Sequence, residues 1–212
     1  MKNILYLLKN ILNMKTKFSF AILFVLFNFH FGNSQTLREI INILADSQNK
    51  TTSEVKKASL LEITNKTLSV NSSSNAYFSG GKTRDVIKIE LPKGTINWYY
   101  RVTVLDIKSN YSYSYNETLA YLLSNKKTMD TYSPTSFGID FYLLGHTGDV
   151  NSFLETGNNN FRSYPTFTKT NTNSFVNYSN FINENLWIGI KNPNASQGLK
   201  VIVEVVTYGY YN

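Results

Sequence analysis

Apolar and polar side chains alternate with a two-residue period over much of the chain, which is the pattern of a β-strand with one buried face. In 85–91, Ile87 and Ile89 fall on one face, while Lys88 and Glu90 fall on the other. The same alternation returns a few residues later and again near the end of the chain. The dominant prediction from this pattern is a mainly β protein.

Two of the alternating runs are close together in the sequence. The segment Leu-Pro-Lys-Gly-Thr (91–95) separates the first run, 85–91, from the second, 97–106. Pro92 fixes its own φ angle and Gly94 can take a positive φ, and both properties are typical of turns. Two alternating runs joined by such a turn predict a β-hairpin.

Further strands are expected at 138–144, 186–191 and 199–208, with irregular strands and long loops in 156–180. Both faces of the last strand are largely apolar, which predicts a central position in its sheet. The turn residues between these runs and their number predict an antiparallel β-sandwich over 70–212.

Helical periodicity is confined to short stretches. In 36–47, apolar residues recur with the i, i+3, i+4, i+7 spacing of an amphipathic helix. Residues 53–63 are expected to add one or two turns, so 35–69 is interpreted as an N-terminal helical segment. Short helical stretches are also expected at 117–124 and 149–155.

A nearly unbroken apolar run, 18–31, follows two lysines near the start of the chain. It leads into small residues that end at Ser34, as in a signal-peptidase site, and it is shorter than the roughly 20 residues of a membrane span. We expect a signal peptide over 1–34, cleaved after Ser34, and a secreted or periplasmic protein with no stable membrane insertion after cleavage. An uncleaved N-terminal anchor is the alternative, and either Met1 or Met14 serves as the start.

Charge and cysteine content exclude several classes of function. The first 34 residues hold four lysines and no acidic residue, so cleavage lowers the formal net charge from +7 to +3. The remaining basic residues are scattered, whereas nucleic-acid-binding proteins gather them on one face, so no nucleic-acid partner is expected. The chain has no cysteine, which excludes disulfides, thiol nucleophiles, cysteine-ligated metals and a lipoprotein anchor. The short signal segment favours a bacterial source.

Several strand and turn segments, taken in order, resemble one known family. They are Leu-Pro-Lys-Gly-Thr (91–95), Trp-Tyr-Tyr-Arg-Val-Thr-Val (98–104), Asp-Phe-Tyr-Leu-Leu (140–144), Leu-Trp-Ile-Gly-Ile-Lys-Asn-Pro-Asn (186–194) and Val-Ile-Val-Glu-Val-Val (201–206). Over about residues 76–208 the chain resembles bacterial pre-peptidase C-terminal-type (PPC-like) domains. The resemblance implies a secreted, jelly-roll-like β-sandwich with no catalytic residues. The chain departs from that family in its N-terminal helical segment and in standing without an enzyme domain beside it.

Candidates for catalysis and metal binding are few. His146 is the one histidine after residue 34, and Asp149 follows it closely. A secreted hydrolase that uses these two residues with an unidentified serine is one alternative, but no Gly-x-Ser-x-Gly motif accompanies them. Asp140, Asp149 and Glu155 are candidates for a calcium site, although the chain lacks an Asp-x-Asp-x-Asp spacing. We therefore expect no enzyme activity, cofactor or metal.

Aromatic residues are the remaining candidates for function. Tyr111, Tyr113 and Tyr115 alternate with serines, so their rings share one face if the stretch is extended. With Tyr99 and Arg101 they are the predicted binding residues, because amphipathic tyrosines suit contacts with sugars or proteins. Packing of the tyrosines in the core and at the edges of the sandwich is the alternative interpretation.

These observations together predict a secreted, non-enzymatic binding module. Its expected partner is an unknown protein or glycan at the cell surface. A structural module of an envelope or secretion assembly is a further alternative.

Overall fold

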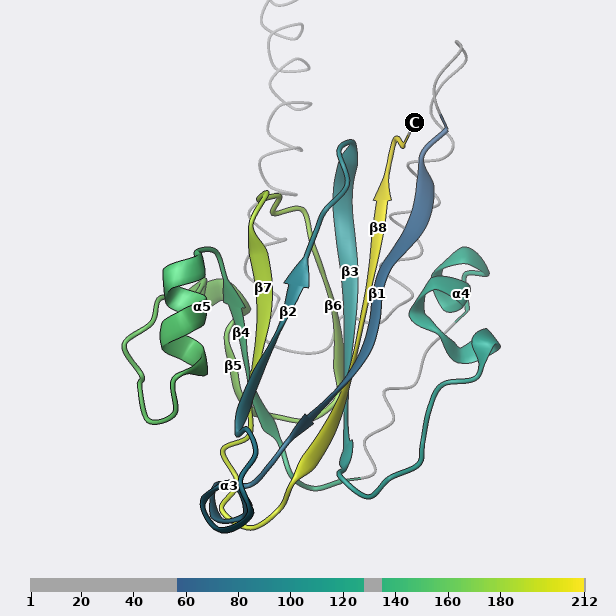
Figure 1. Cartoon of the computed structure of the whole chain (residues 1–212). Coiled ribbons are helices and arrows are strands. Elements are labelled where there is room, and N and C mark those ends of the chain that lie inside the picture. The colour runs from purple at the N-terminus through teal and green to yellow at the C-terminus, as the bar shows by residue number, and fades with distance from the viewer. Residues whose placement is uncertain (1–56, 128–134, 212) are drawn as a thin grey trace, which may run out of the picture. The chain divides into compact units, whose positions relative to one another are not determined.

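The computed structural model describes residues 57–127 and 135–211. Strands in this part of the chain form two four-stranded antiparallel sheets, so the predicted β-sandwich is confirmed (Figure 1). Sheet A contains, in order, β1 (Ser59–Val70), β8 (Leu199–Gly209), β3 (Thr95–Asp106) and β6 (Phe175–Ser179). Sheet B contains, in order, β2 (Arg84–Ile89), β7 (Leu186–Lys191), β4 (Ile139–Leu144) and β5 (Lys169–Thr172).

Each strand of the first half of the domain pairs with its counterpart in the second half. β4 pairs with β5, β3 with β6, β2 with β7 and β1 with β8, all antiparallel. A long hairpin that is then rolled up produces these pairs, and β3–β8 and β4–β7 pairing completes the two sheets. The resulting orders 1-8-3-6 and 2-7-4-5 are those of a jelly roll. The expected jelly-roll-like form is therefore confirmed.

The predicted hairpin between 85–91 and 97–106 is wrong. β2 pairs with β7, while β3 pairs with β6 and β8, so these two strands lie in opposite sheets. The turn between them does form, because Thr95 N donates to Pro92 O at 3.1 Å and Gly94 has a φ of 95°. It carries the chain from one sheet to the other, which places the apolar faces of β2 and β3 opposite each other.

The predicted helical character of 35–69 is wrong for the residues that the structure describes. Ser59–Val70 is strand β1, so the sandwich begins before residue 70. The register of β1 on β8 shifts between Glu62 and Thr64, and Leu60 packs on the outer face of sheet A while Leu68 packs in the core. Such a bulge interrupts the two-residue period. The proposed helix at 36–47 and the signal peptide at 1–34 lie outside the described residues.

Short helices lie on the faces and at one end of the sandwich (Figure 1). η1 (Tyr115–Glu117) and α4 (Leu119–Ser124) lie on the outer face of sheet A, and α5 (Thr147–Leu154) lies on the outer face of sheet B. η2 (Pro165–Phe167) precedes β5. α4 and α5 confirm the expected helical stretches. α3 (Ser73–Ser79), which the sequence did not predict, lies at the end of the sandwich where β1 ends and β2 begins. None of the helices in the described part of the chain has the length and apolar character that crossing a bilayer requires.

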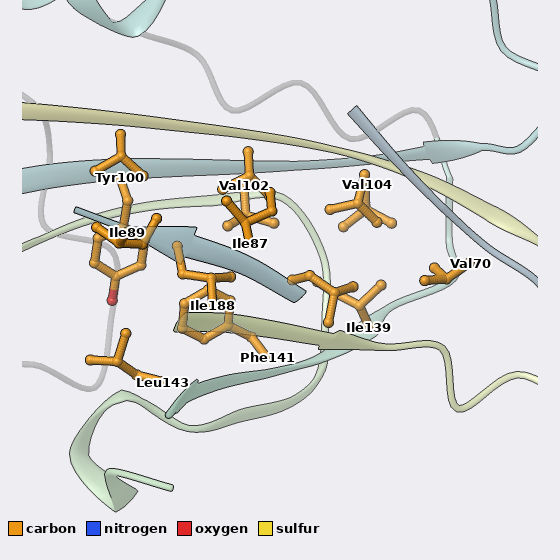
Figure 2. Packing of buried hydrophobic residues seen from close by; sticks show 14 of the residues in the cluster. Val70, Ile87, Ile89, Tyr100, Val102, Val104, Ile139, Phe141, Leu143 and Ile188 are labelled. Atoms are coloured by element: carbon orange, nitrogen blue, oxygen red, sulfur yellow. The ribbon is translucent and has the colours of Figure 1, made fainter. Parts of the chain in front are cut away.

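The core fills the space between the two sheets with inward-facing side chains from both (Figure 2). Tyr100 of β3 stacks on Phe141 of β4, with 5.5 Å between ring centroids, and on Trp98 at 5.0 Å. The Tyr100 hydroxyl accepts a hydrogen bond from Asn177 Nδ2 at 3.1 Å. Burial raises the pKa of this hydroxyl well above its usual range, so Tyr100 stays neutral. These rings join sheet A to sheet B.

Replacing Phe141 with alanine is expected to lower the free energy of unfolding by about 3–5 kcal/mol, because it removes a buried ring between the sheets. Urea denaturation of the purified protein measures this change. Phe78→Ala is the matched control, since Phe78 is 81% exposed, and its effect should stay within about 0.5 kcal/mol. Equal losses in the two variants would contradict the position of Phe141 in the core.

Candidate functional site

The residues 107–118, here called the tyrosine segment, contain the predicted binding residues Tyr111, Tyr113 and Tyr115. The segment follows the outer face of sheet A without forming a strand, so the condition under which the three rings would share one strand face is not met. Tyr111 and Tyr113 are half-buried and meet edge to face, with 5.3 Å between centroids. Tyr115 is 80% exposed and contacts Tyr121 at 5.4 Å between centroids. The row is divided into two separate pairs.

Tyr99 and Arg101, the other predicted binding residues, are both buried, which excludes them as surface contacts. Tyr99 packs beneath α4, and its ring stacks on Tyr178 at 6.1 Å between centroids. Burial raises the pKa of the Tyr99 hydroxyl. The guanidinium of Arg101 donates through Nε to the Glu204 carboxylate and through Nη2 to Glu117 O at 2.8 Å.

The buried Arg101–Glu204 ion pair fastens the tyrosine segment and α4 to sheet A. The Tyr113 ring covers the Arg101 guanidinium, with 3.6 Å between the ring centroid and Cζ, and its hydroxyl pairs with that of Thr103. Glu204 Oε1 accepts from Leu119 N, at the start of α4, at 2.8 Å. Tyr99 and Tyr113 therefore serve packing, which was the alternative interpretation of the tyrosines, and Arg101 is buried with them.

His146 and Asp149 lie together in a small hollow of about 120 Å³ that also contains Ser163. Asp149 Oδ1 accepts from Arg162 N at 2.9 Å, and its Oδ2 lies 3.3 Å from Arg162 Nη2. The Arg162 backbone N–H is the main cause that lowers the pKa of the Asp149 carboxyl. The Ser163 hydroxyl lies 3.1 Å from the Thr168 hydroxyl. Among the described residues, the hydrogen bonds of these side chains are not those of a Ser–His–Asp triad.

The proposed calcium ligands Asp140, Asp149 and Glu155 do not converge. Asp140 Oδ2 lies 3.1 Å from Lys191 Nζ, and Glu155 Oε2 accepts from Asn158 Nδ2 at 2.8 Å. Within 57–127 and 135–211, no three His, Cys, Asp or Glu side chains gather as metal ligands do. The three acids considered as candidates for a calcium site are therefore separate in the described part of the chain.

A larger hollow of about 610 Å³ lies beside α3, and the sequence did not reveal it. We call it the α3 hollow. Its walls come from α3, from residues 81–84, from residues 156–157 after α5 and from residues 191–193 at the end of β7. Tyr77 lines it and is 83% exposed, and the Phe78 ring meets the Tyr77 ring edge to face at 5.0 Å between centroids. This is the candidate site that the structure brings together.

Backbone hydrogen bonds fix α3 at this end of the sandwich. Ser73 N donates to Asn194 O at 3.2 Å and Ser74 N donates to Ala195 O at 3.0 Å. Buried Asn192 supports the same loop, because its Nδ2 donates to Val70 O at 3.2 Å and to Gln197 O at 2.8 Å. The aromatic side chains of α3 are therefore carried on an anchored backbone.

Two glycines follow α3, at the turn that leads to β2. Gly80 and Gly81 have φ angles of 74° and 108°, a region that side chains disfavour. A Cβ at Gly81 would lie 2.0 Å from Asn71 Nδ2. The adjacent aromatic residues before a Gly-Gly pair were the one signal of this site in the sequence, because α3 is too short to show a periodic pattern.

A row of charges crosses the outer face of sheet B at the α3 hollow. Lys191 of β7 lies in register with Arg84 of β2 on one side and with Asp140 of β4 on the other. The Arg84 guanidinium donates to backbone oxygens of Phe153, Glu155 and Asn158 and, at 2.8 Å, to the Asn159 side chain. Arg84 therefore bonds to neutral acceptors, while Lys191 pairs with Asp140.

No protein-family model matches this chain, and no curated protein sequence matches it. The likeness to pre-peptidase C-terminal-type domains therefore stays a prediction.

Replacing Arg101 with methionine is expected to cost about 3–5 kcal/mol of unfolding free energy, because it leaves the buried Glu204 carboxylate unpaired. In the double variant Arg101→Met/Glu204→Gln, the loss should be smaller than the sum of the two single losses. Chemical denaturation of all four proteins gives this coupling. Lys88→Met is the control, because Lys88 and Glu90 form an exposed pair that contributes at most about 1 kcal/mol. Additive losses would contradict a direct Arg101–Glu204 interaction.

The lowered pKa of Asp149 predicts that its carboxylate stabilises the fold at neutral pH and that this stabilisation is lost in strong acid. A carboxyl whose pKa is lower in the folded state stabilises the fold above its ordinary value of 3.8, and this contribution is lost as the pH falls through the lowered folded value. Asp149→Asn should therefore reduce the fall in melting temperature between neutral pH and strong acid. Identical acid profiles of the variant and the original protein would contradict the Asp149–Arg162 contact.

Proposed function

We propose that this chain is a secreted, non-enzymatic binding module that holds a glycan in the α3 hollow. The observation that carries the proposal is the exposure of Tyr77 and Phe78, which are 83% and 81% exposed beside the hollow. Leaving apolar area in water forgoes about 25 cal/mol per Å², so two neighbouring rings held outward on an anchored helix favour a contact role.

The size and lining of the α3 hollow favour a small polar ligand with an apolar face. Its volume of about 610 Å³ falls within the range of roughly 300–1,000 Å³ that is usual for small-molecule sites. Ser73, Thr83 and Thr156, which carry hydroxyl groups, line it together with Tyr77. A sugar unit has this combination of hydroxyl groups and an apolar ring face, whereas a protein partner more often meets a flat surface.

The proposed site replaces the tyrosine segment as the centre of binding. Of the five binding residues expected from the sequence, Tyr99 and Arg101 are buried, and Tyr111 and Tyr113 are half-buried. Tyr115 alone is mostly exposed. The secreted location belongs to the same proposal, since a glycan at a cell surface is accessible to a secreted protein, and the resemblance to PPC-like domains agrees with it.

Tyr77→Ala is expected to weaken glycan binding at least about tenfold, which corresponds to roughly 1.4 kcal/mol, because it removes the exposed ring of the hollow. An array of neutral and acidic glycans identifies ligands, and calorimetry with the purified protein measures affinity. Tyr115→Ala is the matched control, because Tyr115 is as exposed as Tyr77 but lies in η1. Neither change should move the melting temperature. An array without a glycan ligand, or equal losses in both variants, would overturn the proposal.

A further inference from the structure

The charges around the α3 hollow are unbalanced. Arg84 and Lys191 both line it, and its described lining contains no Asp or Glu. The two cations are also register partners on neighbouring strands, and like charges directly opposite each other destabilise a sheet. One carboxylate, that of Asp140, pairs with Lys191 from the far side of the row.

Arg84 is held in place by neutral hydrogen-bond acceptors. It is 6% exposed, and its guanidinium donates to Phe153 O at 2.9 Å and to Glu155 O at 3.3 Å, at the C-terminal end of α5. The carbonyl groups at a helix C-terminus favour a cation, but they do not neutralise it as a carboxylate would. Arg84 is thus a fixed positive charge in the wall of the hollow.

Lys191 is the group that can reach a ligand. Its side chain is 28% exposed, and its ammonium lies 3.1 Å from Asp140 Oδ2. An ammonium has three N–H donors, so donors beyond the one used by Asp140 are available to a second acceptor. Oxygens of a carboxylate or sulfate form strong, charge-assisted hydrogen bonds with such a donor.

We infer that the α3 hollow selects acidic saccharides, with the sugar ring against Tyr77 and a carboxylate or sulfate group at Lys191, in the positive field of Arg84. The inference rests on the proposed function, because it names the ligand class of the same site. A free inorganic anion would use the two cations but leave the Tyr77 ring without a role, whereas a neutral sugar would use the ring but leave the cations unbalanced.

The test compares pairs of ligands that differ at the charged group. A galacturonic acid oligosaccharide is titrated against its methyl ester, and a carrageenan oligosaccharide against its desulfated form, with the purified full-length protein. At least one charged form should bind about tenfold or more tightly than its neutral partner. Raising the salt concentration from about 50 to about 500 mM should weaken the charged form far more than the neutral one, because salt screens exposed charges.

Variants of Lys191 and Asp140 should change the affinity for the charged ligand in opposite directions. Lys191→Met should bring the charged ligand down to the affinity of the neutral one, whereas Asp140→Asn should increase the affinity for the charged ligand by freeing the ammonium. The double variant Lys191→Met/Asp140→Asn leaves no unpaired carboxylate, so it keeps the test valid if Lys191→Met alone fails to fold. Lys88→Met is the control, since Lys88 lies on the same sheet, pairs with Glu90 and does not line the hollow.

The outcomes separate this inference from the proposed function. Equal binding of charged and neutral forms, with loss in Tyr77→Ala, would overturn the acidic selectivity and leave the glycan site in place. Tighter binding of adenosine monophosphate than of every saccharide, again lost in Tyr77→Ala, would overturn the saccharide assignment. If binding of the saccharides is absent or does not depend on Tyr77, both proposals fail.

Discussion

No covalent bridge ties sheet A to sheet B, because the chain contains no cysteine, so the contact between their apolar inner faces has to hold the sandwich together. Tyr100 and Phe141 lie at this contact, and aliphatic residues of both sheets surround them. The strands that meet here are distant in sequence, since the first strand of the domain pairs with the last. The core therefore depends on contacts between segments that are far apart in the sequence, which is typical of β-sandwiches.

On each outer face of the sandwich, a buried arginine attaches a neighbouring helical segment to the sheet, but the two arginines have different partners. A buried arginine on sheet A, Arg101, binds the segment that leads into α4, and a buried arginine on sheet B, Arg84, binds the segment that ends α5. Arg101 has a carboxylate partner, Glu204, and an aromatic cover, so its charge is neutralised and enclosed. Arg84 has neutral acceptors beside an open hollow. The first arrangement pairs the buried charge with a carboxylate, and the second leaves a positive charge without a carboxylate partner in the wall of the hollow.

The alternation of apolar and polar residues predicted most of the strands, but it could not predict which strands pair with each other. The strands at 186–191 and 199–208 were predicted almost to the residue. In each of them, the residues that face the core do so at every second position from one end of the strand to the other. The supposed hairpin failed because alternation tells which face is buried and not which sheet a strand joins. The strand β1 was mistaken for helix because the bulge at Glu62 to Thr64 moves its apolar residues from one face to the other.

The candidate site was harder to predict than the fold because its parts are adjacent only in the folded chain. Tyrosines at 111–115 stood out in the sequence by their spacing, yet Tyr113 is placed by a buried guanidinium that no local pattern reveals. Arg84 and Lys191 look like ordinary polar positions of two alternating strands until β2 pairs with β7.

The position of the α3 hollow follows from the topology. In a jelly roll, the connections between paired strands gather at the ends of the sandwich, and loops on such a rigid scaffold commonly carry function. The walls of the hollow come from the β1–β2 connection, from the residues after α5 and from the end of β7, and they are separated by as many as 120 residues in the chain, from Ser73 to Pro193. Arg84 joins two of these walls, because it belongs to β2 and its guanidinium binds the chain after α5. The residue that gives the hollow its fixed charge is therefore also one that holds its shape, so changes at Lys191 and Asp140 address the charge of the site without removing a wall.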